Sequence, residues 1–230
     1  MKIKLFIFNI LFSSSLFANV LPPDINLIYE LNFEQQPLGL IEINYKKTKD
    51  NYLISATSDF KGALLLMGNY QIISRGRIDK NHFIPESIER KNLKKNKIIS
   101  SQIDHKNNLI QIKSKNKAKE YKLQNNTQDI LSYFFEISVL KNLPKQIDFN
   151  ILDSHDYKKY SYLMQGHEKI MINDRLVNVI KYEGRVNDET LTHTLWISQK
   201  NHIPVRLITP TPIGLIIDQV LSKGNILNLI

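Results

Sequence analysis

Residues 27–33 read Leu-Ile-Tyr-Glu-Leu-Asn-Phe, and this stretch sets the pattern for most of the chain. Large apolar side chains stand at every second position from Leu27 to Phe33, with Glu30 and Asn32 between them. Successive side chains of a β-strand point to opposite faces, so the alternation predicts a strand with one buried face. The same period of two returns in residues 41–46 and again in residues 52–56 after a Lys-Asp-Asn turn.

Further short segments extend this pattern to the end of the chain. Candidate strands include Leu64–Ser74, Ile78–Ile84 and a closing strand at Asn225–Leu229, and the pair Asn173-Asp174 is a tight-turn signal. No linker or repeat interrupts them, so residues 19–230 read as a single domain. A sheet of this many strands cannot stay flat. The sequence therefore predicts a mainly β fold built on one strongly curved antiparallel sheet, a half-barrel or open barrel.

One segment has helical rather than strand periodicity. In residues 129–143, apolar side chains fall at positions 130, 131, 134, 137 and 140, and Pro144 follows. Asp129 or Thr127 can cap the first turn. We expect a helix here that lies on the concave side of the sheet, with Ile130, Phe134 and Ile137 facing it.

The N-terminus resembles a secretory signal peptide. Lys2 and Lys4 precede a short apolar run that is well below the roughly 20 residues needed to span a bilayer, and Ala18 offers a cleavage point. We therefore expect residues 1–18 to be removed and the mature protein to be periplasmic. A buried N-terminal strand and an uncleaved anchor are the alternatives. No later segment has the length and apolarity of a transmembrane span.

Composition excludes several classes of site. The chain has no cysteine, which rules out thiol redox enzymes, cysteine hydrolases and zinc sites with cysteine ligands. The six histidines show no metal-binding spacing, so we expect neither a metal nor a cofactor. The motifs Ser154-His-Asp156 and Gly166-His-Glu168 contain catalytic residue types, but adjacent strand residues point to opposite faces. We therefore expect structural or surface roles for these histidines.

The chain carries 31 Lys and Arg residues against 22 Asp and Glu residues. Its heavy use of Lys, Asn and Ile accounts for this balance without a nucleic-acid partner. Many of the cations fall in a basic middle segment, residues 90–122, where Lys113, Lys115, Lys117 and Lys119 alternate and on one strand would share a face. That face can contact an anionic membrane or glycan, or it can simply keep an edge strand soluble.

Several ordered motifs resemble the bacterial domain-of-unknown-function family numbered 3108, a group of exported envelope proteins. They are Leu38-Gly-Leu-Ile-Glu-Ile43, Ser74-Arg-Gly76 with Pro85-Glu-Ser87, Gln128-Asp-Ile-Leu-Ser-Tyr-Phe134, and Leu195-Trp-Ile197 with Pro204-Val-Arg206. The positions that carry the resemblance are Gly39, Gly76, Asp129, Ser132, Trp196, Pro204 and Arg206. The resemblance implies an envelope location and a mostly β, curved fold, and it implies no known activity. In architecture alone, the expected fold is similar to periplasmic lipoprotein carriers.

The candidate ligand-pocket residues are the large apolar side chains of the helix and of two strands: Met67, Ile130, Phe134, Ile137 and Trp196. Each can equally be part of a packed core. Asp129 and Ser132 can form a polar pair at a cavity mouth or a helix cap, and Arg206 can bind a headgroup or form a structural ion pair.

These observations favour a periplasmic, non-enzymatic protein that binds a hydrophobic or amphipathic envelope molecule, such as a lipid, in a curved β-sheet. The alternative is a structural or assembly factor that docks another envelope protein and holds no small molecule. An enzyme is the third reading. An apolar pocket of several hundred cubic ångströms would distinguish the first reading from the second.

Overall fold

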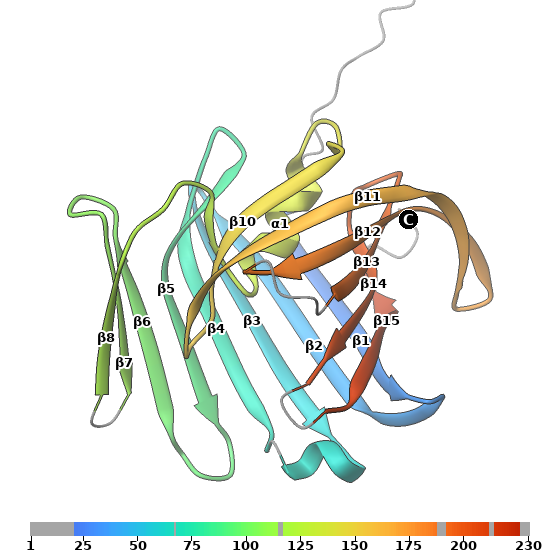
Figure 1. Ribbon diagram of the computed structural model, residues 1–230, viewed down its shortest axis with the longest axis horizontal. Coiled ribbons are helices and arrows are strands. Elements are labelled where there is room, and N and C mark those ends of the chain that lie inside the picture. The colour runs from blue at the N-terminus through green and yellow to red at the C-terminus, as the bar shows by residue number, and fades with distance from the viewer. Residues whose placement is uncertain (1–20, 67, 115–116, 188–191, 212–213, 226–230) are drawn as a thin grey trace, which may run out of the picture.

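The computed structural model describes residues 21–66, 68–114, 117–187, 192–211 and 214–225. Over these residues the chain forms one sheet, one α-helix and one 3-10 helix (Figure 1). The strands are β1 Asp24–Phe33, β2 Gln36–Thr48, β3 Asn51–Phe60, β4 Tyr70–Asp79, β5 His82–Asn92, β6 Ile98–Asp104, β7 Leu109–Ser114, β8 Lys117–Lys122, β9 Thr127–Asp129, β10 Gln146–Leu152, β11 Tyr157–Ile172, β12 Arg175–Val186, β13 Thr192–Ser198, β14 Pro204–Pro210 and β15 Ile216–Gly224. The helices are η1 Gly62–Leu66 and α1 Ser132–Val139.

The sheet runs in the order β8-β7-β6-β5-β4-β3-β2-β1-β15-β14-β13-β12-β11-β10-β9. The prediction of a mainly β fold with one α-helix is confirmed for the described residues. In that part of the chain, the ladder from β8 to β9 does not close into a barrel. The expectation of a purely antiparallel sheet is wrong, because β9 pairs with β10 in parallel. The chain leaves β9, passes through α1 and returns beside it, and such a crossover is what permits parallel pairing.

The helix is shorter than the predicted 129–143. Its N-terminal boundary moves because residues 127–129 form β9, which pairs with Asn150, Ile151 and Leu152 of β10. Its C-terminal boundary moves because Leu140 has extended backbone angles, several residues before Pro144. Backbone pairing with β10 therefore outweighs the helical periodicity at Asp129.

Two predicted strands also differ from those observed. The segment Leu64–Ser74 is divided between η1 and β4, and Ile78–Ile84 is divided by the turn between β4 and β5. At this turn Lys80 and Asn81 have φ values of 48° and 69°, so the chain reverses there instead of continuing. The turn predicted at Asn173-Asp174 is present, with φ values of 47° and 60°. The predicted strand Asn225–Leu229 and residues 1–18 lie almost wholly outside the described residues.

Helix α1 lies between two halves of the sheet, which we call the N-terminal half (β1–β8) and the C-terminal half (β9–β15) (Figure 1). On one side, the Phe135 ring stacks on Tyr45 of β2 with ring centroids 4.9 Å apart. On the other side, Tyr133 packs edge-on against Phe149 of β10, at 6.3 Å between centroids. Six of the eight helix residues are buried, among them Ser132, Glu136 and Ser138, which explains why the apolar stripe was a poor guide to the buried residues.

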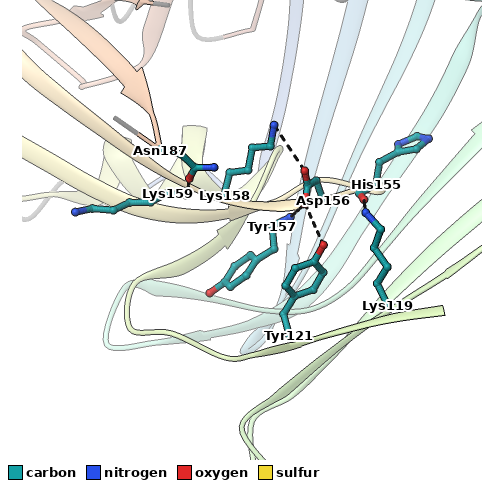
Figure 2. A network of polar contacts seen from close by, with 8 residues as sticks. All are labelled: Lys119, Tyr121, His155, Asp156, Tyr157, Lys158, Lys159 and Asn187. Carbon is teal, nitrogen blue, oxygen red and sulfur yellow. Dashed lines mark hydrogen bonds and ion pairs between the residues drawn. The ribbon is translucent and has the colours of Figure 1, made fainter. Parts of the chain in front are cut away.

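Strand β8, at one end of the sheet, makes polar contacts with the turn between β10 and β11, as Figure 2 shows. The Tyr121 hydroxyl of β8 donates to Asp156, in the turn between β10 and β11, at 3.0 Å. The Lys119 amine donates to the His155 carbonyl oxygen at 3.2 Å. The Tyr157 hydroxyl accepts a hydrogen bond from the Gln124 backbone N–H at 3.1 Å. These bonds hold β8 beside the C-terminal half although no ladder is described between them.

Candidate functional site

A cavity of about 360 Å³ lies against α1, between the two halves of the sheet. Most of its wall is apolar or aromatic. The N-terminal half contributes Tyr29, Ile41, Ile43, Ala56, Phe60, Tyr70 and Ile72. The C-terminal half and the α1 region contribute Ile130, Leu131, Tyr133, Phe134, Ile151, Tyr160, Tyr162 and Leu207. Its volume falls in the lower part of the range of roughly 300–1,000 Å³ that is typical of small-molecule sites.

A few polar groups interrupt this wall: Ser58, Arg90, His193, Thr209 and Gln219. His193 Nδ1 and Thr209 Oγ1 are 3.0 Å apart. Burial lowers the pKa of His193, so its imidazole is neutral near pH 7. The composition of the wall suits a molecule that is mostly apolar and has a small polar part.

Arg90 is the cation of this wall. Its guanidinium carbon lies 3.8 Å from the centroid of the Tyr70 ring, a cation–π geometry. Its Nη1 is 3.9 Å from Asp153 Oδ1, which is longer than a hydrogen bond. Its Nε is buried and has no hydrogen-bond partner. The side chain is 19% exposed, so Arg90 is not sealed within the core.

The helix residues next to the cavity are held by a buried polar cluster around Asp129. Asp129 Oδ1 accepts hydrogen bonds from the backbone N–H groups of Leu131 and Ser132, at 2.8 and 3.0 Å. Its Oδ2 accepts one from the Ser74 hydroxyl at 2.6 Å, and Ser74 Oγ lies 3.2 Å from the Tyr52 hydroxyl. Burial raises the pKa of Asp129, and the bonds from Ser74 and Ser132 oppose that shift. Asp129 and Ser132 therefore brace the start of α1 and, unlike Ile130, are not part of the cavity wall.

A second group of side-chain hydrogen bonds fixes the other end of this region. Glu136 of α1 accepts a hydrogen bond from the Phe83 backbone N–H at 2.7 Å, and its other oxygen is 2.7 Å from His82 Nδ1. The Gln128 side-chain amide donates to the Phe83 carbonyl oxygen at 2.8 Å. The start of β5, which is not paired with β6 there, is thus attached to β9 and α1.

The pocket candidates from the sequence are distributed over different regions. Ile130 and Phe134 line the cavity. Ile137 is fully buried in a second core cluster with Ile147 and Tyr182 and does not line it. Met67 lies outside the described residues.

Trp196 lies on the face of the sheet opposite the cavity. It alternates with Leu195 and Ile197, which belong to the second core cluster. Its indole N–H donates to Glu168, and the Arg206 guanidinium lies 4.8 Å from its ring centroid. Ile172, Val177 and Val179 of the β11–β12 hairpin share a core cluster with Trp196, and Trp196 is not among the residues that line the cavity.

The remaining family-motif positions have backbone or ion-pair roles. At Gly39, with φ of 133°, a Cβ atom would lie 2.2 Å from the Asp59 carbonyl oxygen, and at Gly76 one would lie 2.2 Å from that of Ile84. The Pro204 carbonyl accepts the buried Tyr29 hydroxyl at 2.6 Å. Arg206 forms two hydrogen bonds with Asp218, both at 2.8 Å.

The Ser154-His155 pair does not have the geometry of a catalytic triad. Ser154 Oγ donates to Asp153 at 2.9 Å and lies 3.0 Å from His155 Nδ1. In a triad the carboxylate orients the histidine, whereas here both groups contact the serine. Among the described residues, no group of three potential ligands could hold a metal ion.

The lysines of the basic middle segment do not share one face. Strand β7 ends at Ser114 and strand β8 begins at Lys117, and positions 115–116 between them lie outside the described residues. Lys113 pairs with Ala118, whereas Lys119 pairs with Ile112. Directly paired residues lie on the same face, so Lys119 is on the face opposite to Lys113. The prediction of a single cationic face failed because the reversal of the chain was not recognised.

Arg90 was missed as a site residue because it was counted with the basic middle segment. A signal was available: Arg90 stands two residues after Ile88, which is 1% exposed, on a regular part of β5. Period-two alternation places both side chains on the inner face, where a cation is unusual.

Within the described part of the chain, no helix has the length and apolarity to cross a membrane.

A family model described as "Protein of unknown function (DUF3108)" matches residues 28–220, which confirms the resemblance seen in the motifs. A search of curated proteins finds no match.

Proposed function

We propose that the protein, which belongs to the DUF3108 family, binds a hydrophobic or amphipathic molecule of the cell envelope. The description of that family names no activity, so the function is inferred from the cavity. The observation that carries the proposal is the cavity of about 360 Å³, whose wall is built from both halves of the sheet and from α1. A void of this kind inside a β fold weakens packing unless something occupies it. In this proposal the protein is a binding protein and not an enzyme.

The proposal includes strong curvature of the sheet, as in a half-barrel. It is supported by the contacts between distant strands, such as Tyr121 with Asp156 and Gln128 with Phe83. The small volume of the cavity favours a ligand with one acyl or alkyl chain over a lipoprotein with several. We also propose that the protein works in the periplasm after removal of residues 1–18, which N-terminal sequencing of the protein from fractionated cells would test.

The binding test uses a neutral lipophilic dye, N-phenyl-1-naphthylamine. We expect the purified protein to raise the fluorescence of the dye and a long-chain fatty acid to displace it. Ala56→Leu places extra carbon atoms in the cavity and should weaken dye binding. Ser55→Leu is the matched control, because its side chain lies on the other face of β3.

Native mass spectrometry of gently purified protein gives an independent test, since a lipid-sized adduct would support the proposal. Equal dye binding by both variants, or none by the unmodified protein, would contradict it. In that case the alternative, an assembly factor that docks another envelope protein, becomes the better explanation.

A further inference from the structure

We infer that the ligand of this cavity is a single-chain amphiphile with an anionic end, a carboxylate or a phosphate, and that Arg90 binds that end. This inference rests on the proposed function and names the chemical class of the ligand. It starts from the one permanently charged side chain in the described cavity wall, which contains no Asp or Glu.

The guanidinium of Arg90 lacks a strong partner in the protein. Its Nε is buried with no acceptor, and an unsatisfied buried donor is costly, more so when it is charged. The nearest carboxylate oxygen, Asp153 Oδ1, is 3.9 Å from Nη1. That oxygen already accepts hydrogen bonds from the backbone N–H and the hydroxyl of Ser154. Asp153 therefore compensates the charge of Arg90 only in part.

The position of Arg90 is fixed, which a binding group requires. Tyr70 lies face-on to the guanidinium at 3.8 Å and holds its plane. Ile72, which pairs with Arg90 across β4 and β5, lines the same cavity. A guanidinium held in this way can donate two parallel hydrogen bonds to a carboxylate or a phosphate.

The rest of the cavity suits the apolar part of such a molecule. Beyond Arg90 the wall is formed by residues such as Ile41, Phe60 and Phe134. Because Arg90 is 19% exposed, the anionic end would lie at the mouth of the cavity and the chain would extend inward. This orientation leaves the charged end partly hydrated and buries the alkyl chain.

The test compares four competitors of the neutral dye: dodecanoate, dodecyl phosphate, 1-dodecanol and inorganic phosphate. We expect both anionic amphiphiles to bind at least about tenfold more tightly than the alcohol, as expected for a charge-assisted hydrogen bond. Dodecanoate against dodecyl phosphate distinguishes the two headgroups. Inorganic phosphate alone should not displace the dye. If it does, the cavity holds a simple anion site and the inference of an amphiphilic ligand is wrong.

Arg90→Gln should remove the preference for the anionic amphiphiles, so that dodecanoate and dodecyl phosphate bind no more tightly than dodecanol. Arg77→Gln is the matched control, because Arg77 is an exposed arginine of β4 in an ion pair with Glu86. Circular dichroism would verify that both variants are folded. If Arg90→Gln keeps the preference, or if the unmodified protein has none, the role of Arg90 is wrong while the cavity function stands. If no competitor and no dye binds, the proposed function itself is wrong.

Discussion

Phe134 and Phe135 are neighbours on α1, yet they face two regions that differ in how they are filled. Phe135 is 1% exposed and touches the rings of Tyr45 and Phe83, so its surroundings are a packed core. Phe134 is half-buried and lines the cavity. The same helix therefore anchors the two halves of the sheet with one side and leaves a space with the other. The difference indicates that the packing of α1 against the sheet at Phe135 does not require the space beside Phe134 to be filled.

The largest expected effect is at the packed side. Phe135→Ala should lower the free energy of unfolding by about 3–5 kcal/mol, because it removes a buried ring and leaves a void among aromatic neighbours. Urea unfolding followed by circular dichroism measures it. A loss below about 1 kcal/mol would show that the packed side is as loosely filled as the cavity side.

The next effect concerns the polar cluster that positions both sides. Asp129→Ala should cost about 3 kcal/mol, because the hydroxyl of Ser74 and two backbone N–H groups lose their acceptor in a buried site. The same unfolding experiment applies, with Asp148→Ala as a control at a more exposed aspartate. Equal losses in the two variants would contradict a special role for Asp129.

A smaller effect is expected at the cavity side. Phe134→Ala should cost about 1–2 kcal/mol, which is the loss of apolar burial for a half-buried ring that already borders a space. It should enlarge the cavity and leave dye binding intact. A loss equal to that of Phe135→Ala would mean that the two sides of α1 are equally packed and would remove the contrast.

The smallest effect is a pH dependence at the cavity wall. Burial lowers the pKa of His193 below the usual value of about 6.5, so the unfolded chain binds a proton more readily than the folded one. Stability should therefore be highest above pH 6.5 and fall as the pH decreases through the lowered pKa. His193→Gln should make the loss between pH 8 and pH 5 smaller, as measured by urea unfolding. An unchanged loss would assign it to His155 and His202, whose pKa values burial also lowers.

Period-two alternation was sufficient to predict that the fold is mainly β, because most strands bury one face and expose the other. It could not predict where the chain reverses without glycine or proline, as at Lys80-Asn81. It also could not show that β9 replaces the first turn of the predicted helix, because that depends on pairing with β10, far along the chain. Trp196 was misleading for a related reason, since its size says nothing about which face of β13 it occupies.

The candidate site was predictable only in part. The apolar wall residues Ile130 and Phe134 follow from the helical stripe. Arg90 could be predicted as a wall residue only from its period-two spacing from Ile88. The proximity of Asp153 to Arg90 depends on the tertiary fold and could not be predicted. Tertiary contacts such as that of Ser74 with Asp129 determine how the two halves of the sheet face each other. The local sequence carries no signal for such contacts.

The pairing of β1 with β15 has a consequence for the folding rate. Among the described strands, every other antiparallel ladder joins strands that are consecutive in the chain, and the parallel pair β9–β10 is consecutive as well. The β1–β15 ladder pairs Leu27 with Gly224 and Asn32 with Asp218, and beside it two hydrogen bonds join Asn26 and Asn225, which are 199 residues apart. Closing so large a loop carries an entropic cost that nearby hairpins avoid, and topologies rich in distant contacts fold slowly.

We therefore expect two meanders to form first. One has β1 as an unpaired edge strand and the other has β15, and these two strands later meet in the middle of the sheet. Until those edges meet, they are the part of the chain most exposed to pairing with another molecule.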